Sequence, residues 1–166
     1  MSARILTVTV SDTRTAANDT SGRLLREELA AFQLVRHSIV KDDRQAIAEL
    51  VEAARTLNEV DVIVFTGGTG ITAADVTVEA LLPIFDKTLD GFGETFRRLS
   101  WESVGAKSLL SRAIAGTVGS LLVVALPGSP NAVKLGVRSV LAPMLSHAVD
   151  LLHGKTKHSG HHEIPR

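Results

Sequence analysis

The sequence predicts one α/β domain with three layers, in which a mainly parallel sheet lies between two layers of helices. Three observations lead to this fold class. β-forming apolar segments alternate along the chain with segments of helical periodicity. Residues 60–65 form a nearly continuous apolar run, which is typical of a strand buried on both faces. The chain has 166 residues, 45% of them hydrophobic, which suits a single domain with its own core.

The first half of the chain has the pattern of two strand–helix units followed by the buried strand. Residues 4–10 alternate between apolar and polar side chains and run into a polar loop. Capping residues at 19–22 precede the first helix. The predicted elements are a strand at 4–10, a helix with apolar positions from 24 to 32, a strand at 35–40, a helix from 47 to 57 and a strand at 60–65.

The second half begins with a glycine-rich loop and ends with a long helix. We expect helices at 75–84 and 91–100, whereas 109–119 is ambiguous, with 111–116 as a possible strand of a local hairpin. A strand at 121–126 leads through a Pro-Gly-Ser-Pro turn into a helix from 132 to about 152. Pro143 predicts a kink or a break in that helix, because proline lacks the N–H and clashes with the preceding turn.

These elements place the domain at residues 1–153 and leave a polar tail at 154–166. The tail contains Gly and Pro, and we expect it to be mobile. Its histidines and His153 are irregularly spaced and no cysteine assists them, so a solvated tail is favoured over a metal site.

Composition excludes several classes of protein. The chain has no cysteine, which rules out disulfides, thiolate metal sites and cysteine nucleophiles. Lys plus Arg and Asp plus Glu are balanced at 18 each, which argues against a nucleic-acid or membrane partner recruited by bulk charge. No signal-peptide pattern opens the sequence, and no apolar stretch approaches membrane-spanning length. We expect a cytoplasmic protein.

Polar and glycine-rich segments follow four of the predicted strands. Ligands of open parallel sheets bind beyond the carboxyl ends of the strands, near the switch in strand order. The four segments therefore predict a ligand site at this edge of the sheet. They are Ser11-Asp12, Asp42-Asp43, the loop of Thr66, Gly67, Gly68, Thr69, Gly70 and Thr72, and Pro127-Gly128-Ser129.

The glycine loop at 67–72 has the composition of a phosphate cradle. Its glycines expose backbone N–H groups and permit positive φ, its threonines add hydroxyls, and a helix whose N-terminus favours anions follows it. A tight strand-to-helix turn explains the glycines equally well. No Walker A motif is present. Residues 68–73 match G-x-G-x-x-A, but they follow the third strand rather than the first, which disfavours a dinucleotide site.

Acidic side chains flank this loop. Asp42 or Asp43 closes the second strand and Asp75 follows the loop, and two acids beside phosphates commonly hold Mg²⁺. Helix capping is the alternative for each of these acids. Ser111-Arg112 offers a guanidinium for a phosphate, and Ser129 either donates to an anion or shapes its turn.

Four further residues have simpler interpretations. Glu94 and Arg97, three residues apart on a predicted helix, predict a surface ion pair. Phe92 and Trp101 are interpreted as packing residues.

An ordered set of motifs resembles the MoaB/MogA family of molybdenum cofactor biosynthesis, and more closely its MoaB branch. The motifs are VSDTR at 10–14, TGGTGIT at 66–72, DVTVEA at 75–80, GFGETFR at 91–97, LSRA at 110–113 and LPGSP at 126–130. The resemblance covers roughly residues 7–147.

The resemblance implies a MogA-like, molybdopterin-binding fold that assembles as trimers or hexamers. It implies molybdopterin adenylyltransfer, with ATP as co-substrate and Mg²⁺ as metal, and other proteins of the cofactor pathway as possible partners. Asp42 and Asp75 match the two essential aspartates of the family, which assigns both to metal and phosphate handling. The strand-end residues named above and Ser111-Arg112 then bind substrate and phosphate.

Two positions depart from the family pattern. Ala74 stands where the family usually has Arg, and Lys41 stands where it often has Pro. Losing a fixed guanidinium beside a phosphate-rich site keeps a non-catalytic, molybdopterin-binding oligomer open as the alternative function. Whether molybdenum or tungsten is taken up downstream, and whether the assembly is a trimer or a hexamer, stay open.

Overall fold

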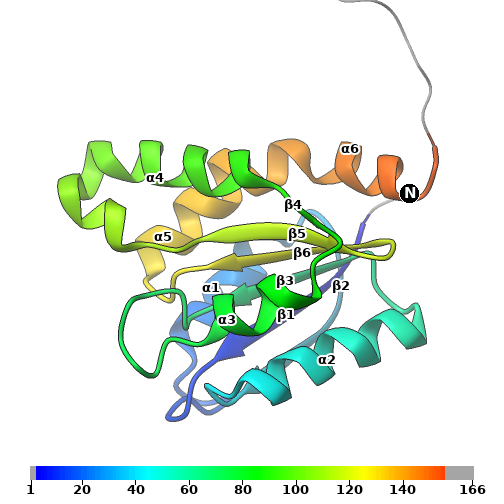
Figure 1. The fold of residues 1–166 in the computed structure, drawn as a ribbon, viewed down its shortest axis with the longest axis horizontal. Coiled ribbons are helices and arrows are strands. Elements are labelled where there is room, and N and C mark those ends of the chain that lie inside the picture. The colour runs from blue at the N-terminus through cyan, green and yellow to red at the C-terminus, as the bar shows by residue number, and fades with distance from the viewer. Residues whose placement is uncertain (1–2, 156–166) are drawn as a thin grey trace, which may run out of the picture.

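The computed structural model describes residues 3–155 and contains one six-stranded sheet between two layers of helices (Figure 1). The expected tail lies outside the described residues except for Gly154 and Lys155. These two residues close the last helix, since their N–H groups donate to the carbonyl oxygens of Leu151 and Asp150 at 3.1 and 2.8 Å. The predicted three-layer α/β fold is confirmed.

The sheet is parallel over four strands and antiparallel at one edge. Its order is β2-β1-β3-β6-β5-β4, with β2, β1, β3 and β6 parallel to one another. β5 runs antiparallel to β6, and β4 antiparallel to β5. The strands are β1 (Arg4–Val10), β2 (Gln33–Val40), β3 (Val62–Thr66), β4 (Lys87–Thr88), β5 (Ile114–Val118) and β6 (Leu121–Leu126).

The second half of the sheet differs in detail from the expectation. The local hairpin is present, but its first strand covers 114–118 rather than 111–116. β4 was not predicted, because two exposed residues carry no alternating pattern.

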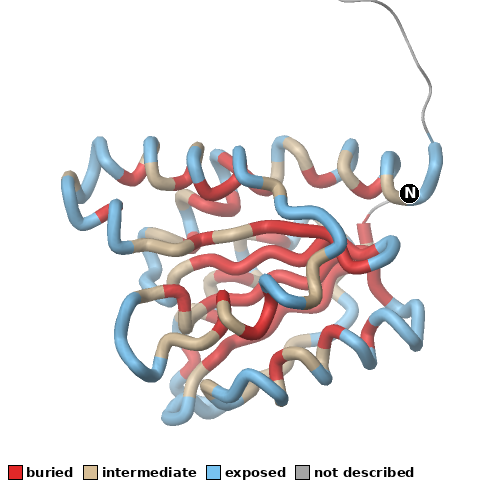
Figure 2. Tube along the Cα trace, viewed as in Figure 1, coloured by how far each residue is buried: buried red, intermediate tan, exposed pale blue. Residues whose placement is uncertain are grey.

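Helices cover both faces of the sheet (Figures 1 and 2). Side chains of opposite parity on one strand serve the two faces: Ile5 packs with α1, α4, α5 and α6, whereas Leu6 packs with α2 and α3. Both faces of the central strands are buried, which is why they are almost continuously apolar. The helices are α1 (Thr20–Glu28), α2 (Arg44–Leu57), α3 (Thr77–Leu81), η1 (Leu82–Ile84), α4 (Asp90–Val104), η2 (Gly105–Leu110), α5 (Pro130–Leu135), η3 (Gly136–Leu141) and α6 (Ala142–Leu152).

Several helix ends follow from identifiable side chains. Asp19 caps α1 by accepting from the N–H of Gly22 at 2.9 Å, and its carboxylate also accepts from Thr9 and contacts His37. α1 ends at Glu28, so Phe32 packs from the following loop rather than from the helix.

The last helix is continuous but changes its hydrogen-bonding pattern near Pro143, where the sequence predicts a kink or a break. The segment η3 is a π-turn that ends just before α6, whose first turn contains Pro143, so the missing proline N–H falls where the helical bonding changes. The helical run Pro130–Leu152 has 23 residues and contains an 18-residue window with a mean hydropathy of 1.2, which matches a membrane span by length and composition only. The statement that no stretch approaches that length was therefore wrong. One face of the run, with Val137, Leu141 and Leu145, is buried against the sheet.

Two interpretations of the fourth helix were also wrong. Trp101 is 52% exposed rather than packed, because it lies on the outer face of α4, whereas Phe92 is buried as expected. Arg97 does not pair with Glu94. Its Nη1 instead donates to the carbonyl oxygens of Ser111 and Ala113, each at 3.4 Å.

Candidate functional site

The segments predicted to form the site meet at one edge of the sheet. The four parallel strands are neighbours, so their carboxyl ends carry the segments after residues 10, 40, 66 and 126 to the same edge. β5 runs the opposite way, which brings Ser111 and Arg112, just before its start, to that edge as well. β1 lies between β2 and β3, so the switch in strand order falls beside Ser11 and Gly67.

Asp12 and Asp42 form a reciprocal pair at the ends of β1 and β2. The N–H of Asp12 donates to Oδ2 of Asp42 at 3.1 Å, and the N–H of Asp42 donates to Oδ1 of Asp12 at 3.2 Å. Burial raises the pKa of Asp42, and the negative charges of Asp12 and Asp75 raise it further. The surroundings of Asp42 therefore disfavour its ionised form, and a bound cation would stabilise that form.

The acids next to this pair have separate tasks. Asp43 caps α2 by accepting from the N–H of Ala46 at 2.7 Å, so capping explains Asp43 but not Asp42. Asp75 is not a helix cap. Its Oδ2 accepts from the N–H and Oγ1 of Thr72 at 2.8 and 2.6 Å, which closes the glycine loop on itself.

The pKa of Asp75 shows how strongly this loop holds the ionised carboxylate. Burial alone raises that pKa, but hydrogen bonds from Thr72 and from the backbone of Gly70, together with the charge of Arg112, bring it below its ordinary value. Asp75 is thus a stable anion at neutral pH with one oxygen directed to its own loop.

The glycine loop has the backbone conformation that its composition predicts. Gly67 and Gly68 have φ of +103° and +67°, in the region that favours glycine. A Cβ on Gly67 would lie 2.5 Å from the carbonyl oxygen of Val10, and one on Gly68 would lie 3.3 Å from Oδ1 of Asp42. The loop therefore passes directly beside the Asp12–Asp42 pair.

The helix after the loop does not form the anion site that we expected. α3 begins at Thr77, has five residues, and is separated from the loop by a turn. The N–H of Thr77 donates to the carbonyl oxygen of Gly68 at 3.0 Å, and its hydroxyl donates to that of Gly67 at 2.9 Å. These donors hold the loop in shape, and the N–H of Gly67 donates to the carbonyl oxygen of Leu126 at 3.0 Å. An anion at this place would contact backbone N–H groups of the loop rather than the helix N-terminus.

Arg112 braces the loop from the other side. Its Nε donates to the carbonyl oxygen of Gly70 at 2.8 Å, and its Nη2 donates to that of Asp75 at 3.2 Å. Both Nη atoms also contact the carboxylate of Glu79 in α3. The guanidinium predicted for a phosphate is occupied within the protein.

The Pro-Gly-Ser turn lies against the glycine loop. Thr66 donates through Oγ1 to the carbonyl oxygen of Pro127 at 3.1 Å, and Gly128 approaches Gly67 so closely that a Cβ on Gly128 would lie 3.4 Å from its Cα. Ser129 shapes the turn, since its Oγ accepts from the N–H of Ala132 at 3.3 Å and caps α5.

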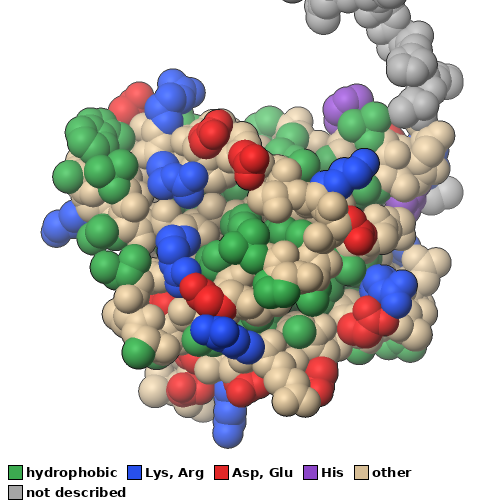
Figure 3. Space-filling view, in the orientation of Figure 1, with side chains coloured by type: hydrophobic (Ala, Val, Ile, Leu, Met, Phe, Trp, Pro, Cys, Tyr) green, Lys and Arg blue, Asp and Glu red, His purple; other side chains and the backbone are tan. Residues whose placement is uncertain are grey.

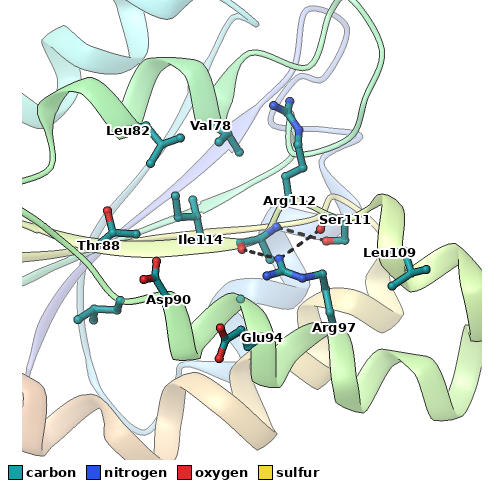
Figure 4. Close-up of a pocket in the computed structure, with 13 residues that line it drawn as sticks. Val78, Leu82, Thr88, Asp90, Glu94, Arg97, Leu109, Ser111, Arg112 and Ile114 are labelled. Carbon is teal, nitrogen blue, oxygen red and sulfur yellow. Dashed lines mark hydrogen bonds between the residues drawn. The ribbon is translucent and has the colours of Figure 1, made fainter.

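Three cavities border this edge. The largest, of about 480 Å³, lies between α3, β4 and α4. Figure 4 shows Asp90, Glu94 and Arg97 along its α4 side, with Arg112 pointing away from them toward the side of Val78. The second, of about 180 Å³, lies between α4, η2 and α5 and reaches the Pro-Gly-Ser turn. The third, of about 320 Å³, lies beside Thr72 and Asp75.

The second cavity contains a polar atom that the sequence did not indicate. Ser108 Oγ is buried and has no hydrogen-bond partner in the described part of the chain. Buried hydroxyl groups are nearly always paired, so this one marks a place for a polar ligand atom. Ser100, Ser103 and Ser111 line the same cavity above an apolar wall that includes Phe96.

Charge around the site is local rather than a broad field. Acidic and basic side chains are interspersed on the face shown in Figure 3, in keeping with equal numbers of both signs in the sequence. Within residues 3–155, no three carboxylate or imidazole side chains gather closely enough to enclose a metal by themselves. The Asp12–Asp42 pair offers two carboxylates, which is sufficient for a Mg²⁺ that keeps several waters.

Comparisons with known proteins identify the family to which the chain belongs. The family described as "Probable molybdopterin binding domain" matches residues 6–147. The chain is similar to molybdenum cofactor biosynthesis protein B of Staphylococcus carnosus, with 48% identity over 90% of this chain and 89% of that protein, and to that of Bacillus cereus, with 46% identity over 88% of each.

Solved structures give the same result. A crystal structure of molybdenum cofactor biosynthesis protein B superposes with a TM-score of 0.89 at 43% identity, over 93% of this chain and 98% of that one. The tungsten cofactor synthesizing protein MoaB from Pyrococcus furiosus superposes with a TM-score of 0.78 at 39% identity, over 89% and 98% of the two chains.

Proposed function

The chain belongs to the molybdenum cofactor biosynthesis protein B family, and from that premise we propose that it binds molybdopterin and adenylylates it with MgATP, releasing pyrophosphate. In the proposed reaction, a terminal phosphate oxygen of molybdopterin forms a bond to the α-phosphorus of ATP. The bond between that phosphorus and the bridging oxygen to the β-phosphate breaks, and pyrophosphate leaves. The reaction is proposed to occur in the cytoplasm.

The main barrier to this reaction is the repulsion between two negatively charged phosphate groups, not a weak nucleophile. A phosphate monoester carries about −1.5 to −2 charge near neutral pH, so its oxygen needs no general base, but it must approach a triphosphate of like charge. Catalysis of phosphoryl transfer accordingly depends on positioning and on electrostatic stabilisation.

The observation that carries the proposal is the Asp12–Asp42 pair directly beside Gly68. Backbone N–H groups of the glycine loop would bind phosphate oxygens in the same place where two carboxylates would hold a cation. Mg²⁺, when bound there, neutralises charge on the phosphates. Asp75 keeps the loop closed through Thr72, so it would act on the phosphates through the loop as well as by its charge.

The cavity around Ser108 supports a place for the pterin ring. Its volume of about 180 Å³ is below the roughly 300–1,000 Å³ of whole-ligand sites, so it would accept one part of a ligand. Pterin nitrogen and oxygen atoms would pair with the serine hydroxyls, and the ring would lie against Phe96. The adjoining Pro-Gly-Ser turn leads from this cavity to the glycine loop.

The decisive experiment incubates the protein with molybdopterin, ATP and Mg²⁺ and measures adenylylated pterin and pyrophosphate by chromatography. We expect both products in equal amounts. The variant Asp42→Asn should lose them, and full turnover by that variant would refute the assignment.

A second candidate is a non-catalytic molybdopterin-binding protein. It is favoured by the two hydrogen bonds that Thr72 makes to Asp75, and by Ala74, an exposed residue with no charge at the position where the family resemblance places arginine. This candidate predicts pterin binding with no pyrophosphate release in the same incubation.

A further inference from the structure

The third cavity at the site edge is lined by an arginine, Arg44, whose guanidinium forms no hydrogen bond or ion pair with any of the residues that the structure describes. The cavity has a volume of about 320 Å³ and lies on the outer side of the glycine loop. Its lining includes two arginines, Arg44 and Arg112, and two acids, Asp75 and Glu79. Arg44 is the first residue of α2, two positions after Asp42, so the turn that places Asp42 also places Arg44.

The two arginines are not equivalent. The guanidinium of Arg112 donates hydrogen bonds to the carbonyl oxygens of Gly70 and Asp75 and to the carboxylate of Glu79. Arg44 is exposed, and its guanidinium has no hydrogen bond or ion pair with any of residues 3–155. It is nevertheless close enough to Glu79 for its charge to help lower the pKa of that carboxyl, after the hydrogen bond from Arg112.

Charge balance restricts what this cavity would bind. Two arginines and two carboxylates line it, so its formal charge is zero and a bare polyanion gains little by entering. A polyanion that brings a divalent cation would pair its phosphate oxygens with Arg44. The cation would then lie near Asp75, because Glu79 is already paired with Arg112. A planar guanidinium with unused donors matches two phosphate oxygens at once.

We propose that this cavity is the subsite for the terminal phosphates of a nucleoside triphosphate, bound as the magnesium complex, with Arg44 as the phosphate-binding residue. The proposal rests on the proposed function, in which those two phosphates leave as pyrophosphate. A triphosphate whose α-phosphate lies at the glycine loop would extend past Thr72 and Asp75 into the cavity, where Arg44 would contact the two phosphates that leave.

Isothermal titration calorimetry of the full chain with inorganic pyrophosphate, with and without Mg²⁺, tests the subsite directly. Arg44→Ala should weaken binding of magnesium pyrophosphate about ten- to hundredfold, as expected for losing charge-assisted hydrogen bonds. It should leave AMP binding unchanged, because AMP has no terminal phosphates. The affinity of Arg44→Lys for magnesium pyrophosphate should lie between those of the wild type and Arg44→Ala. Lysine keeps the positive charge but lacks the paired N–H donors of the guanidinium.

Arg55→Ala is the matched control, because it removes the same charge from the far end of the same helix, where Arg55 pairs with Glu52. Pyrophosphate binding by this variant should equal that of the wild type. The proposal is overturned if the wild type does not bind magnesium pyrophosphate, if Arg55→Ala weakens binding as much as Arg44→Ala, or if Arg44→Ala weakens AMP equally. Arg44-dependent pyrophosphate binding without adenylylation would instead refute only the proposed function.

Discussion

Asp42 carries a charge that its surroundings disfavour, whereas its neighbour Asp43 carries one that stabilises the fold. Burial and two nearby acids raise the pKa of Asp42, and nothing cationic within the described chain offsets them. Asp43 instead binds the N–H of Ala46 and fixes the start of α2. Of these two adjacent aspartates, Asp43 therefore stabilises the fold, whereas Asp42 has the binding role in the proposed function.

Replacing Asp42 by Asn should affect stability and activity in opposite directions. A raised folded pKa means that stability falls as pH rises from the ordinary aspartate value through the pKa of folded Asp42, so the wild type carries this cost at neutral pH. Asp42→Asn should therefore raise the melting temperature at pH 7 while reducing adenylylation at least about hundredfold. Thermal melting and product chromatography measure the two quantities.

Asp43→Asn is the control for that experiment, since Asn caps helices as well as Asp does. It should leave both the melting temperature and the activity close to those of the wild type. A loss of activity in Asp43→Asn equal to that in Asp42→Asn would contradict the division of roles.

At the scale of elements, the glycine loop is held from three sides. Thr77 binds the carbonyl oxygens of Gly67 and Gly68, Arg112 binds that of Gly70, and Thr66 ties the loop strand to the Pro-Gly-Ser turn. Such a loop keeps its remaining N–H groups fixed before a ligand arrives, so little ordering cost is expected on binding.

Gly67→Ala tests this rigidity. A Cβ at a φ of +103° and 2.5 Å from the carbonyl oxygen of Val10 should cost about 1–3 kcal/mol in the free energy of unfolding and should also weaken nucleotide binding. Gly91→Ala is the matched substitution, because nothing lies within 4 Å of that Cβ in α4. It should stabilise the protein by up to about 1 kcal/mol without affecting binding. Urea unfolding measures the change in the free energy of unfolding, and calorimetry measures nucleotide binding. Unchanged stability and binding in Gly67→Ala would show that the loop does not need this backbone conformation.

Secondary-structure elements were easier to predict from the sequence than the contacts between them. Strands buried on both faces and caps such as Asp19 and Asp43 leave local signals, and those elements were predicted correctly. β4 was not predicted because it exists through pairing with β5, which no local pattern encodes. The internal use of Arg112 and the unpaired hydroxyl of Ser108 also depend on residues distant in sequence, so only the structure shows them.

On the scale of the whole molecule, the sheet separates two edges with different tasks. The edge at the carboxyl ends of the parallel strands carries the loops and the three cavities described above. At the opposite edge, Asp61 is buried between the first and last elements. It accepts from the N–H and Nη2 of Arg4, each at 2.8 Å, and lies 3.3 Å from Nε2 of His153.

Asp61→Asn should destabilise the fold in a pH-dependent way. Burial raises the pKa of Asp61, but the hydrogen bonds from Arg4 outweigh it, so the folded pKa is lowered. The stabilisation is present above the ordinary aspartate pKa of about 3.9 and is lost as pH falls through the folded value. We expect Asp61→Asn to cost about 1–3 kcal/mol at pH 7 and progressively less in acid. Urea unfolding at several pH values measures this, with the exposed Glu59→Gln as a control that should show no effect.

The expected homo-oligomer, a trimer or a hexamer, stays a prediction at this scale. Exposed apolar side chains gather at the end of α4 and in η2, where Trp101 is 52% and Leu109 is 64% exposed. The double variant Trp101→Glu and Leu109→Glu should shift the sedimenting species toward the monomer. Leu57→Glu, at an isolated apolar residue that is 58% exposed on α2, should not. Sedimentation identical to the wild type in the double variant would exclude this surface.

Contact of both Arg4 and His153 with Asp61 has a consequence for the connectivity of the chain. The start of β1 and the end of α6 are adjacent, because Arg4 and His153 both contact Asp61. A short linker would therefore close the backbone into a ring without disturbing the sheet. The ring could be reopened at the left-handed turn of Asn58, which lies at the same edge as Asp61. A circularly permuted protein would keep the loops at the carboxyl ends of the parallel strands intact and would have both of its new ends at the opposite edge.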